Sequence, residues 1–163
     1  MKTTIHCGEL SGEAEDRWNA GRAERIEKDI SEYIEAETTL PEAAQECEIS
    51  LTFAGEAQRA EINKEYRKTE GPTDVLSFAM WENEEGAFEP PADWESLPLG
   101  DIVVCPEAVA KNAAGNGKSV ESETVLVICH GFLHLIGFDH AEEDERADMW
   151  ARQERMVKEF FGE

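Results

Sequence analysis

Three of the four histidines in this 163-residue chain lie within eleven positions, at His130, His134 and His140. On a helix, residues four apart lie one above the other on the same face, so the first two imidazole rings would be neighbours. Helices bind zinc through this spacing, with Zn–N bonds of roughly 2.0–2.1 Å. Gly137 can end the helix in a left-handed conformation and let the chain return, bringing His140 back as a third ligand. The run therefore predicts a metal site.

Three neutral imidazole ligands would leave a fourth coordination position open, which distinguishes catalytic zinc sites from structural ones. The same nitrogens also suit copper, nickel or iron, so zinc is expected only as a preference. An isolated pair of histidines at this spacing is more often part of a core. Here a glycine stands where the turn is needed, and this favours a metal. Cys129 would point about 100° away from His130 around the helix, so we expect it to pack in the core.

The elements that position these residues follow from the hydrophobic pattern. Alternating or short apolar runs predict strands over residues 3–7, 48–53, 73–78 and 101–105. Helical spacing predicts helices over about 12–36, 55–67, 106 to beyond 112, 119–136 and 142–160. The fourth of these begins at a capping Ser119 and is apolar nearly all round, which is typical of a central, buried helix. We interpret the apolar stripe of the last helix as core; it consists of Met149, Trp150, Met156, Val157, Phe160 and Phe161.

One segment, Trp81 to Pro98, has no sustained periodicity. It is acidic and contains prolines. Eighteen unpatterned residues are long for a connection in a compact domain, so the segment is either a hairpin-like excursion or a mobile flap.

Composition limits the class of protein. A chain of this length suits one domain, residues 1–163. It has no run of about 18 uncharged apolar residues, and its first residues do not form a secretory signal, so we expect neither a membrane span nor secretion. The four cysteines have no paired spacing and are expected to be reduced thiols of a cytoplasmic protein; they are Cys7, Cys47, Cys105 and Cys129.

The formal net charge of −22 opposes ordinary nucleic-acid binding, because an acidic surface repels phosphates. Most of this charge is expected to lie on exposed helix faces, where it keeps the protein soluble. An anionic substrate would then need a local basic cleft together with the positive charge of the metal. The most basic stretch lies between Arg59 and Lys68, and it includes Lys64 and Arg67.

Taken together, these residues resemble the YbeY family of bacterial endoribonucleases, also called ribosomal-RNA maturation factors. The histidine run 130–140 carries the resemblance most specifically, with its Gly137 and Asp139. Three shorter segments support it: residues 63–67 (NKEYR), 72–78 (PTDVLSF) and 99–102 (LGDI). Residues 1–60 and the last helix match the family only in general plan.

The resemblance implies an α+β fold, with a small mixed sheet of about four strands packed by helices and a zincin-like central helix. It implies one zinc ion held by His130, His134 and His140, and cleavage of single-stranded RNA in maturation of the 3′ end of small-subunit ribosomal RNA and in ribosome quality control. The expected partners are ribosomal RNA, the small ribosomal subunit and ribosome-associated proteins, with no DNA or membrane. Arg67 is implied to line the active-site cleft and to be needed for activity, although a solvated arginine at a helix end fits the sequence equally well.

The predicted chemistry is metal-assisted phosphodiester hydrolysis, with Arg67 stabilising charge on the equatorial oxygens. Asp139 either orients a histidine through its second ring nitrogen or caps a turn. Metzincin peptidases have a similar histidine spacing, but a glutamate base follows their first histidine, where this chain has Gly131. We expect the glycine to leave room for a phosphodiester beside the metal, so that Gly131→Glu would block cleavage and leave zinc bound.

Two alternatives remain open. One is a metallopeptidase with an unusual general base, which Gly131 disfavours. The other is a non-catalytic ribosome-assembly protein whose zinc is structural. The second requires a fourth protein ligand, and the available donors are His6, Cys7, Cys47 and Cys105.

Overall fold

The computed structural model describes residues 2–7, 22–37, 40–54, 75–138 and 142–162. Four strands form one mixed sheet in the order β1-β2-β4-β3. Their bounds are β1 Lys2–Cys7, β2 Glu46–Phe53, β3 Val75–Ala79 and β4 Ser96–Val104. β1, β2 and β4 run parallel, and β3 pairs antiparallel with β4 at the edge. The predicted α+β class with a small mixed sheet is therefore confirmed.

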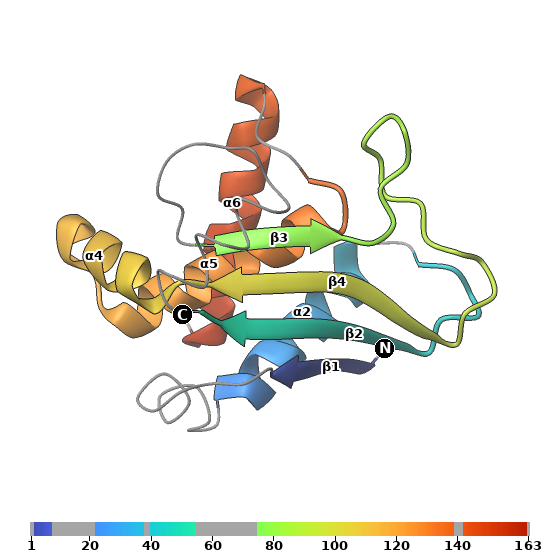
Figure 1. The fold of residues 1–163 in the computed structure, drawn as a ribbon, viewed down its shortest axis with the longest axis horizontal. Coiled ribbons are helices and arrows are strands. Elements are labelled where there is room, and N and C mark those ends of the chain that lie inside the picture. Colours follow the sequence, from blue (N-terminus) through green and yellow to red (C-terminus); the bar gives the residue numbers. More distant parts are fainter. Residues whose placement is uncertain (1, 8–21, 38–39, 55–74, 139–141, 163) are drawn as a thin grey trace.

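The described helices are α2 Arg22–Glu37, α4 Pro106–Asn116, α5 Val120–Leu135 and α6 Glu143–Phe160. Figure 1 shows α2 and α5 behind the sheet, on one of its faces. α5 packs against β3 and β4, α2 packs against β1, and α6 packs against both of these helices. α5 is thus the central helix, with strands on one side of it and α6 on another.

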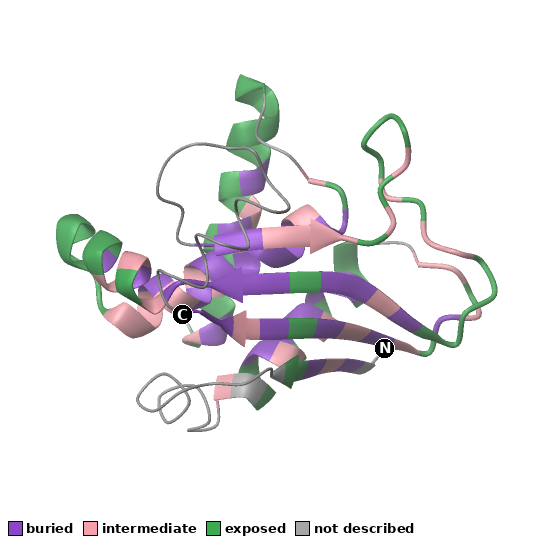
Figure 2. Ribbon diagram, in the orientation of Figure 1, coloured by how far each residue is buried: buried purple, intermediate pink, exposed green. Residues whose placement is uncertain are grey.

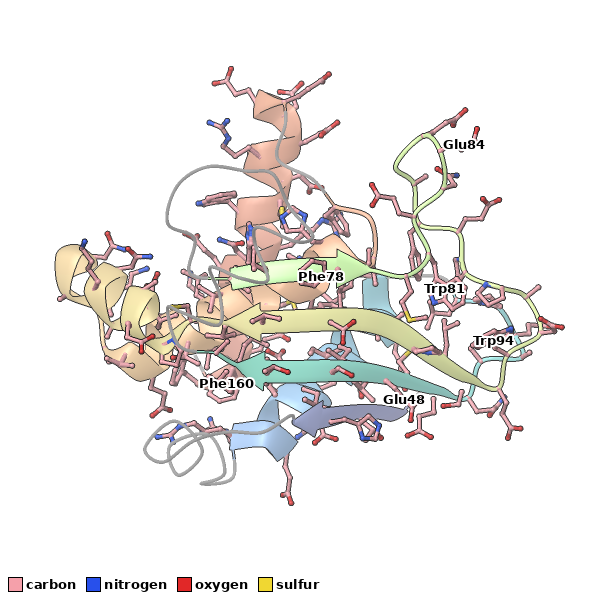
Figure 3. All side chains as sticks on the ribbon, viewed as in Figure 1. Glu48, Phe78, Trp81, Glu84, Trp94 and Phe160 are labelled. Atoms are coloured by element: carbon pink, nitrogen blue, oxygen red, sulfur yellow. The ribbon has the colours of Figure 1, made fainter. Side chains whose placement is uncertain are left out.

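The face of the sheet toward the helices forms the core. Along β2 every second side chain is buried, namely Cys47, Ile49, Leu51 and Phe53. This alternation follows from the period of two in a strand, which places successive side chains on opposite faces. Figure 2 shows the alternation as purple segments along β2. Every residue of α5 is buried or half-buried. No helix in the described parts of the chain is long and apolar enough to cross a membrane.

Most of the predicted elements are confirmed where the structure describes them. Strands β1, β2 and β3 begin within a few residues of their predicted starts, and so do the helices predicted from 106, 119 and 142. The first part of the predicted helix 12–36 and all of the predicted helix 55–67 lie outside the described residues.

The segment between β3 and β4 is a hairpin-like excursion, one of the two forms expected for it. Glu82 and Phe88 form an antiparallel bridge, and the Asn83 side-chain oxygen accepts from the backbone N–H of Glu85 and of Ala87, both at 2.9 Å. The predicted start of β4 at 101 is wrong, since the strand begins at Ser96. Pro98 obscured this start, because proline donates no ladder hydrogen bond.

Candidate metal centre

Helix α5 fixes the positions of His130 and His134. Its N-terminus is capped by Ser119, whose hydroxyl oxygen accepts from the backbone N–H of Ser122 at 3.0 Å. The residues between and beside the histidines, Phe132 and Leu133 among them, are completely buried. Both histidines themselves are only partly buried. The helix is therefore held rigidly in the core while one strip of it, which carries the two imidazoles, reaches the surface.

The two imidazoles converge through the same ring atom. The His130 Nε2 and His134 Nε2 atoms are 3.1 Å apart, and the ring centroids are 4.6 Å apart with the planes at 81°. In a tetrahedral zinc site with Zn–N bonds of roughly 2.0–2.1 Å, two ligand nitrogens are about 3.3 Å apart. The observed separation therefore fits two ligands of a single metal ion.

A side chain of α6 bonds the second ring nitrogen of His130, Nδ1. Gln153 is 4% exposed, and its Oε1 atom lies 2.9 Å from His130 Nδ1. An amide oxygen can only accept, so Nδ1 carries the hydrogen in this arrangement. The lone pair of a neutral imidazole is then on Nε2, the atom that faces His134.

The turn after α5 has the form predicted for it. Gly137 has a φ of +102°, in the left-handed region that favours glycine. Its backbone N–H donates to the carbonyl oxygen of His134 at 3.1 Å, and that of Phe138 donates to Leu133 at 3.0 Å. These are the two bonds of a Schellman motif. A Cβ at residue 137 would also lie 3.0 Å from Phe88 Cβ, so the excursion before β4 packs on this turn.

Three predicted site residues lie outside the described residues: Arg67, Asp139 and His140. Their roles remain predictions. Within the described parts of the chain, no group of three or more histidine, cysteine or acidic residues could hold a metal ion. The structure therefore brings together two members of the predicted triad, and the role of His140 as the third ligand stays a prediction.

The structure corrects the explanation offered for Gly131. A Cβ on this residue would lie 3.0 Å from Ser77 Oγ on β3 and 3.1 Å from Ile102 Cγ2 on β4. The missing side chain thus faces the sheet, and it allows α5 to approach two strands closely. Gly131→Glu would therefore disturb the packing of the helix, so the expectation that it would act on cleavage alone is wrong.

Two residues of α6 belong to the site, although the sequence argument did not assign them to it. Trp150 was interpreted as core, but it is 42% exposed, and its ring centroid is 5.7 Å from that of His130. Gln153 occupies a core position of the stripe formed by Met149, Met156 and Phe160, which are all buried. A polar side chain within a buried apolar stripe needs a hydrogen-bond partner, and this signal in the sequence could have identified Gln153.

The alternative donors for a closed structural zinc site lie elsewhere. His6 is on β1, at the opposite edge of the sheet from β3, and its Nε2 atom is 3.0 Å from Glu48 Oε1. Cys47 and Cys105 are fully buried, and the Cys105 thiol donates to Glu107 at 3.4 Å. Burial raises the pKa of the Cys47 thiol to about 11, which opposes the thiolate form that binds metals. Cys129 is also buried, as predicted, and burial raises its pKa well above the ordinary value.

Several arginines of α2 and α6 are paired with carboxylates. Arg22 bonds Glu121 at 2.6 Å, and Arg155 bonds Glu37 at 3.0 Å. Arg152 bonds Asp148 at 3.1 Å and the Tyr33 hydroxyl at 2.7 Å. The Arg152–Asp148 pair lies within α6, and the other bonds connect one helix to another. The stretch 59–68, the most basic one available for binding phosphate, lies outside the described residues.

Comparison with known proteins identifies the family of the chain. A model of the family described as Endoribonuclease YbeY matches residues 13–161. The Endoribonuclease YbeY of Micrococcus luteus is 43% identical over 115 residues, which are 71% of each chain. That of Shouchella clausii is 39% identical over 139 residues, which are 83% of this chain and 84% of the relative. The solution structure of TM1509 from Thermotoga maritima covers 98% of this chain and is itself covered to 89%, with a TM-score of 0.60 and 27% identity.

The mixed sheet over a histidine-bearing helix, together with these matches, places the chain among the nucleases, a class of hydrolases. More narrowly, the chain belongs to the endoribonuclease YbeY family. The resemblance indicated by the sequence motifs is therefore confirmed.

Proposed function

We propose that the protein is a zinc-dependent, single-strand-specific endoribonuclease that matures the 3′ end of small-subunit ribosomal RNA and acts in ribosome quality control. The observation that carries the metal dependence is the convergence of the Nε2 atoms of His130 and His134, 3.1 Å apart on a rigid helix. Family membership supports the endoribonuclease activity. With this substrate the protein would act in the cytoplasm, with the small ribosomal subunit as its partner.

His130, His134 and His140 would hold the ion. Once bound, zinc would supply Lewis-acid activation of water and of a phosphoryl oxygen. Arg67 would donate to the equatorial oxygens of the phosphate through its planar guanidinium. Asp139 would orient a histidine ring, and since Gln153 already bonds the second nitrogen of His130, that ring would be His134 or His140.

Preference for single strands has a physical basis in Trp150. Its indole is 42% exposed and lies next to His130. Unpaired bases stack on exposed aromatic rings, whereas bases inside a duplex are already stacked on one another. A base next to the scissile phosphate could therefore contact Trp150 only when the strand is unpaired.

The proposal is tested with purified, untagged protein. Metal analysis should find about one zinc per chain. A single-stranded fragment of small-subunit ribosomal RNA should be cut, while the same fragment annealed to its complement and casein should not be. Chelation and His134→Ala should each abolish cleavage and reduce bound zinc. His6→Ala is the matched control, because this histidine is exposed and lies at the far edge of the sheet.

Because the protein is strongly acidic, the assay is repeated with intact small subunits as substrate. Cleavage of casein would favour the peptidase alternative. Zinc bound without any RNA cleavage, on free RNA or on subunits, would refute the nuclease and favour a structural metal.

A further inference from the structure

Gln153 is a side chain of α6 that bonds an imidazole of the histidine pair. It lies three residues after Trp150 and is 4% exposed, in the buried stripe with Met149 and Met156. An apolar residue at this position would continue the stripe without a polar group to satisfy. The buried amide at this position instead bonds the imidazole of His130.

We infer that Gln153 is a positioning residue that fixes the tautomer of His130 and so prepares its Nε2 atom to bind the metal. The inference rests on the metal site of the proposed function. With Gln153 Oε1 as acceptor 2.9 Å away, the hydrogen of the neutral ring stays on Nδ1. The lone pair of His130 is then on Nε2, and it points toward His134 Nε2.

The two histidines are consequently unequal before metal binds. His130 Nε2 has no hydrogen, so in the 3.1 Å contact between the rings His134 Nε2 is the donor. His134 must give up this hydrogen, or move it to Nδ1, before it can bind a cation. His130 needs no such change. If Gln153 were lost, His130 could exchange tautomers, and part of the population would present an N–H where the metal binds.

The amide also orients the ring. His130 extends from α5, while Gln153 extends from α6, which packs along α5. A hydrogen bond between two packed helices therefore sets the rotation of the imidazole about its Cβ–Cγ bond. Residues that orient metal ligands in this way commonly contribute about 10- to 100-fold to metal affinity.

The test compares three variants with the wild type. Gln153→Met keeps the length of the side chain and suits the apolar stripe, but it removes the amide acceptor. Gln153→Glu keeps an acceptor oxygen at the same position. Met156→Leu is the matched control, because it changes a buried neighbour on the same stripe one turn away and leaves the His130 bond intact.

Three measurements are made on each protein, the first of which is a thermal unfolding curve. Long-range ¹H–¹⁵N correlation spectra of the metal-free protein report which ring nitrogen of His130 carries the hydrogen. Competition with a chromophoric chelator gives the dissociation constant for Zn²⁺ at fixed pH. We expect the Nδ1–H tautomer in the wild type and in Met156→Leu, and a mixture in Gln153→Met. Zinc affinity should fall about 10- to 100-fold in Gln153→Met, with no loss of thermal stability, and should largely recover in Gln153→Glu.

The inference is overturned if wild-type His130 carries its hydrogen on Nε2, or if Gln153→Met binds zinc within about twofold of the wild type. Equal weakening in Gln153→Met and Gln153→Glu would also overturn it, because the acceptor would then not be the cause. These results are separate from those for the nuclease. If the wild-type protein binds zinc but does not cleave RNA, the proposed function is refuted, while the role of Gln153 in zinc binding is unaffected.

Discussion

Replacing Asp29 by asparagine is predicted to stabilise the fold at neutral pH and above. Asp29 lies on α2 and is 4% exposed. Burial raises the pKa of this carboxyl from 3.8 to about 7, and the negative charge of Glu159 on α6 adds to the effect. The folded protein therefore carries a carboxyl group that resists ionisation.

The sign of the pH dependence follows from this raised pKa. Below about pH 4 the carboxyl is protonated in both the folded and the unfolded chain, so it adds no penalty. Between pH 4 and 7 the unfolded chain ionises while the folded chain stays protonated, and stability falls as the pH rises. Above pH 7 the penalty is complete. The difference between 3.8 and about 7 corresponds to about 4 kcal/mol, which is an upper limit because side-chain and solvent relaxation reduces it.

The assay is urea unfolding at about pH 5.5 and about pH 8. Asp29→Asn should raise the free energy of unfolding more at pH 8 than at pH 5.5. The linkage relation limits this difference to about 2 kcal/mol, and we expect about 1–2 kcal/mol. Glu24→Gln makes the same change of charge at an exposed position of the same helix and serves as the control. A gain that is equal at the two pH values, or a loss of stability that grows with pH, would refute the reasoning.

Three further changes have definite expected outcomes. Gly131→Glu should lower the free energy of unfolding by about 1–3 kcal/mol, because the new side chain would meet Ser77 and Ile102; unchanged thermal stability would contradict this packing role. Ser119→Ala removes the N-terminal cap of α5 and should cost about 1 kcal/mol in urea unfolding, whereas a cost near zero would mean that water replaces the cap. Trp150→Ala should weaken binding of single-stranded RNA by about 1–3 kcal/mol, roughly 5- to 150-fold, with little change in melting temperature. A fluorescence anisotropy titration measures this affinity, and an affinity equal to that of the wild type would exclude stacking.

The sequence predicted those features that depend on near neighbours along the chain. The Ser119 cap, the left-handed Gly137 and the pairing of His130 with His134 were all expected before the structure, and all are present. Each of them is set within one helix or one turn, where the rise and rotation per residue are fixed. The strands were predictable for the same reason, since burial on one face imposes a period of two.

The errors concern contacts between elements. Gly131 was assigned to the metal side of α5, but its missing side chain faces β3 and β4. The early start of β4 depends on its pairing with β2, a strand more than forty residues earlier in the chain. Sequence periodicity shows which face of a helix is apolar, but it does not show which strand or helix covers that face.

The family, the mixed α+β class and the histidine pair at the end of a buried helix are all predictable from the order of the residues. The surroundings of that pair are not, since Gln153 bonds one ring nitrogen of His130 and Trp150 lies beside the same ring through the packing of α6 on α5. Spacing along one helix follows from backbone geometry that every sequence shares. The height and rotation of α6 against α5 follow instead from the shapes of many packed side chains, among them Met149, Met156 and Phe160, and these act together only when the whole core has formed.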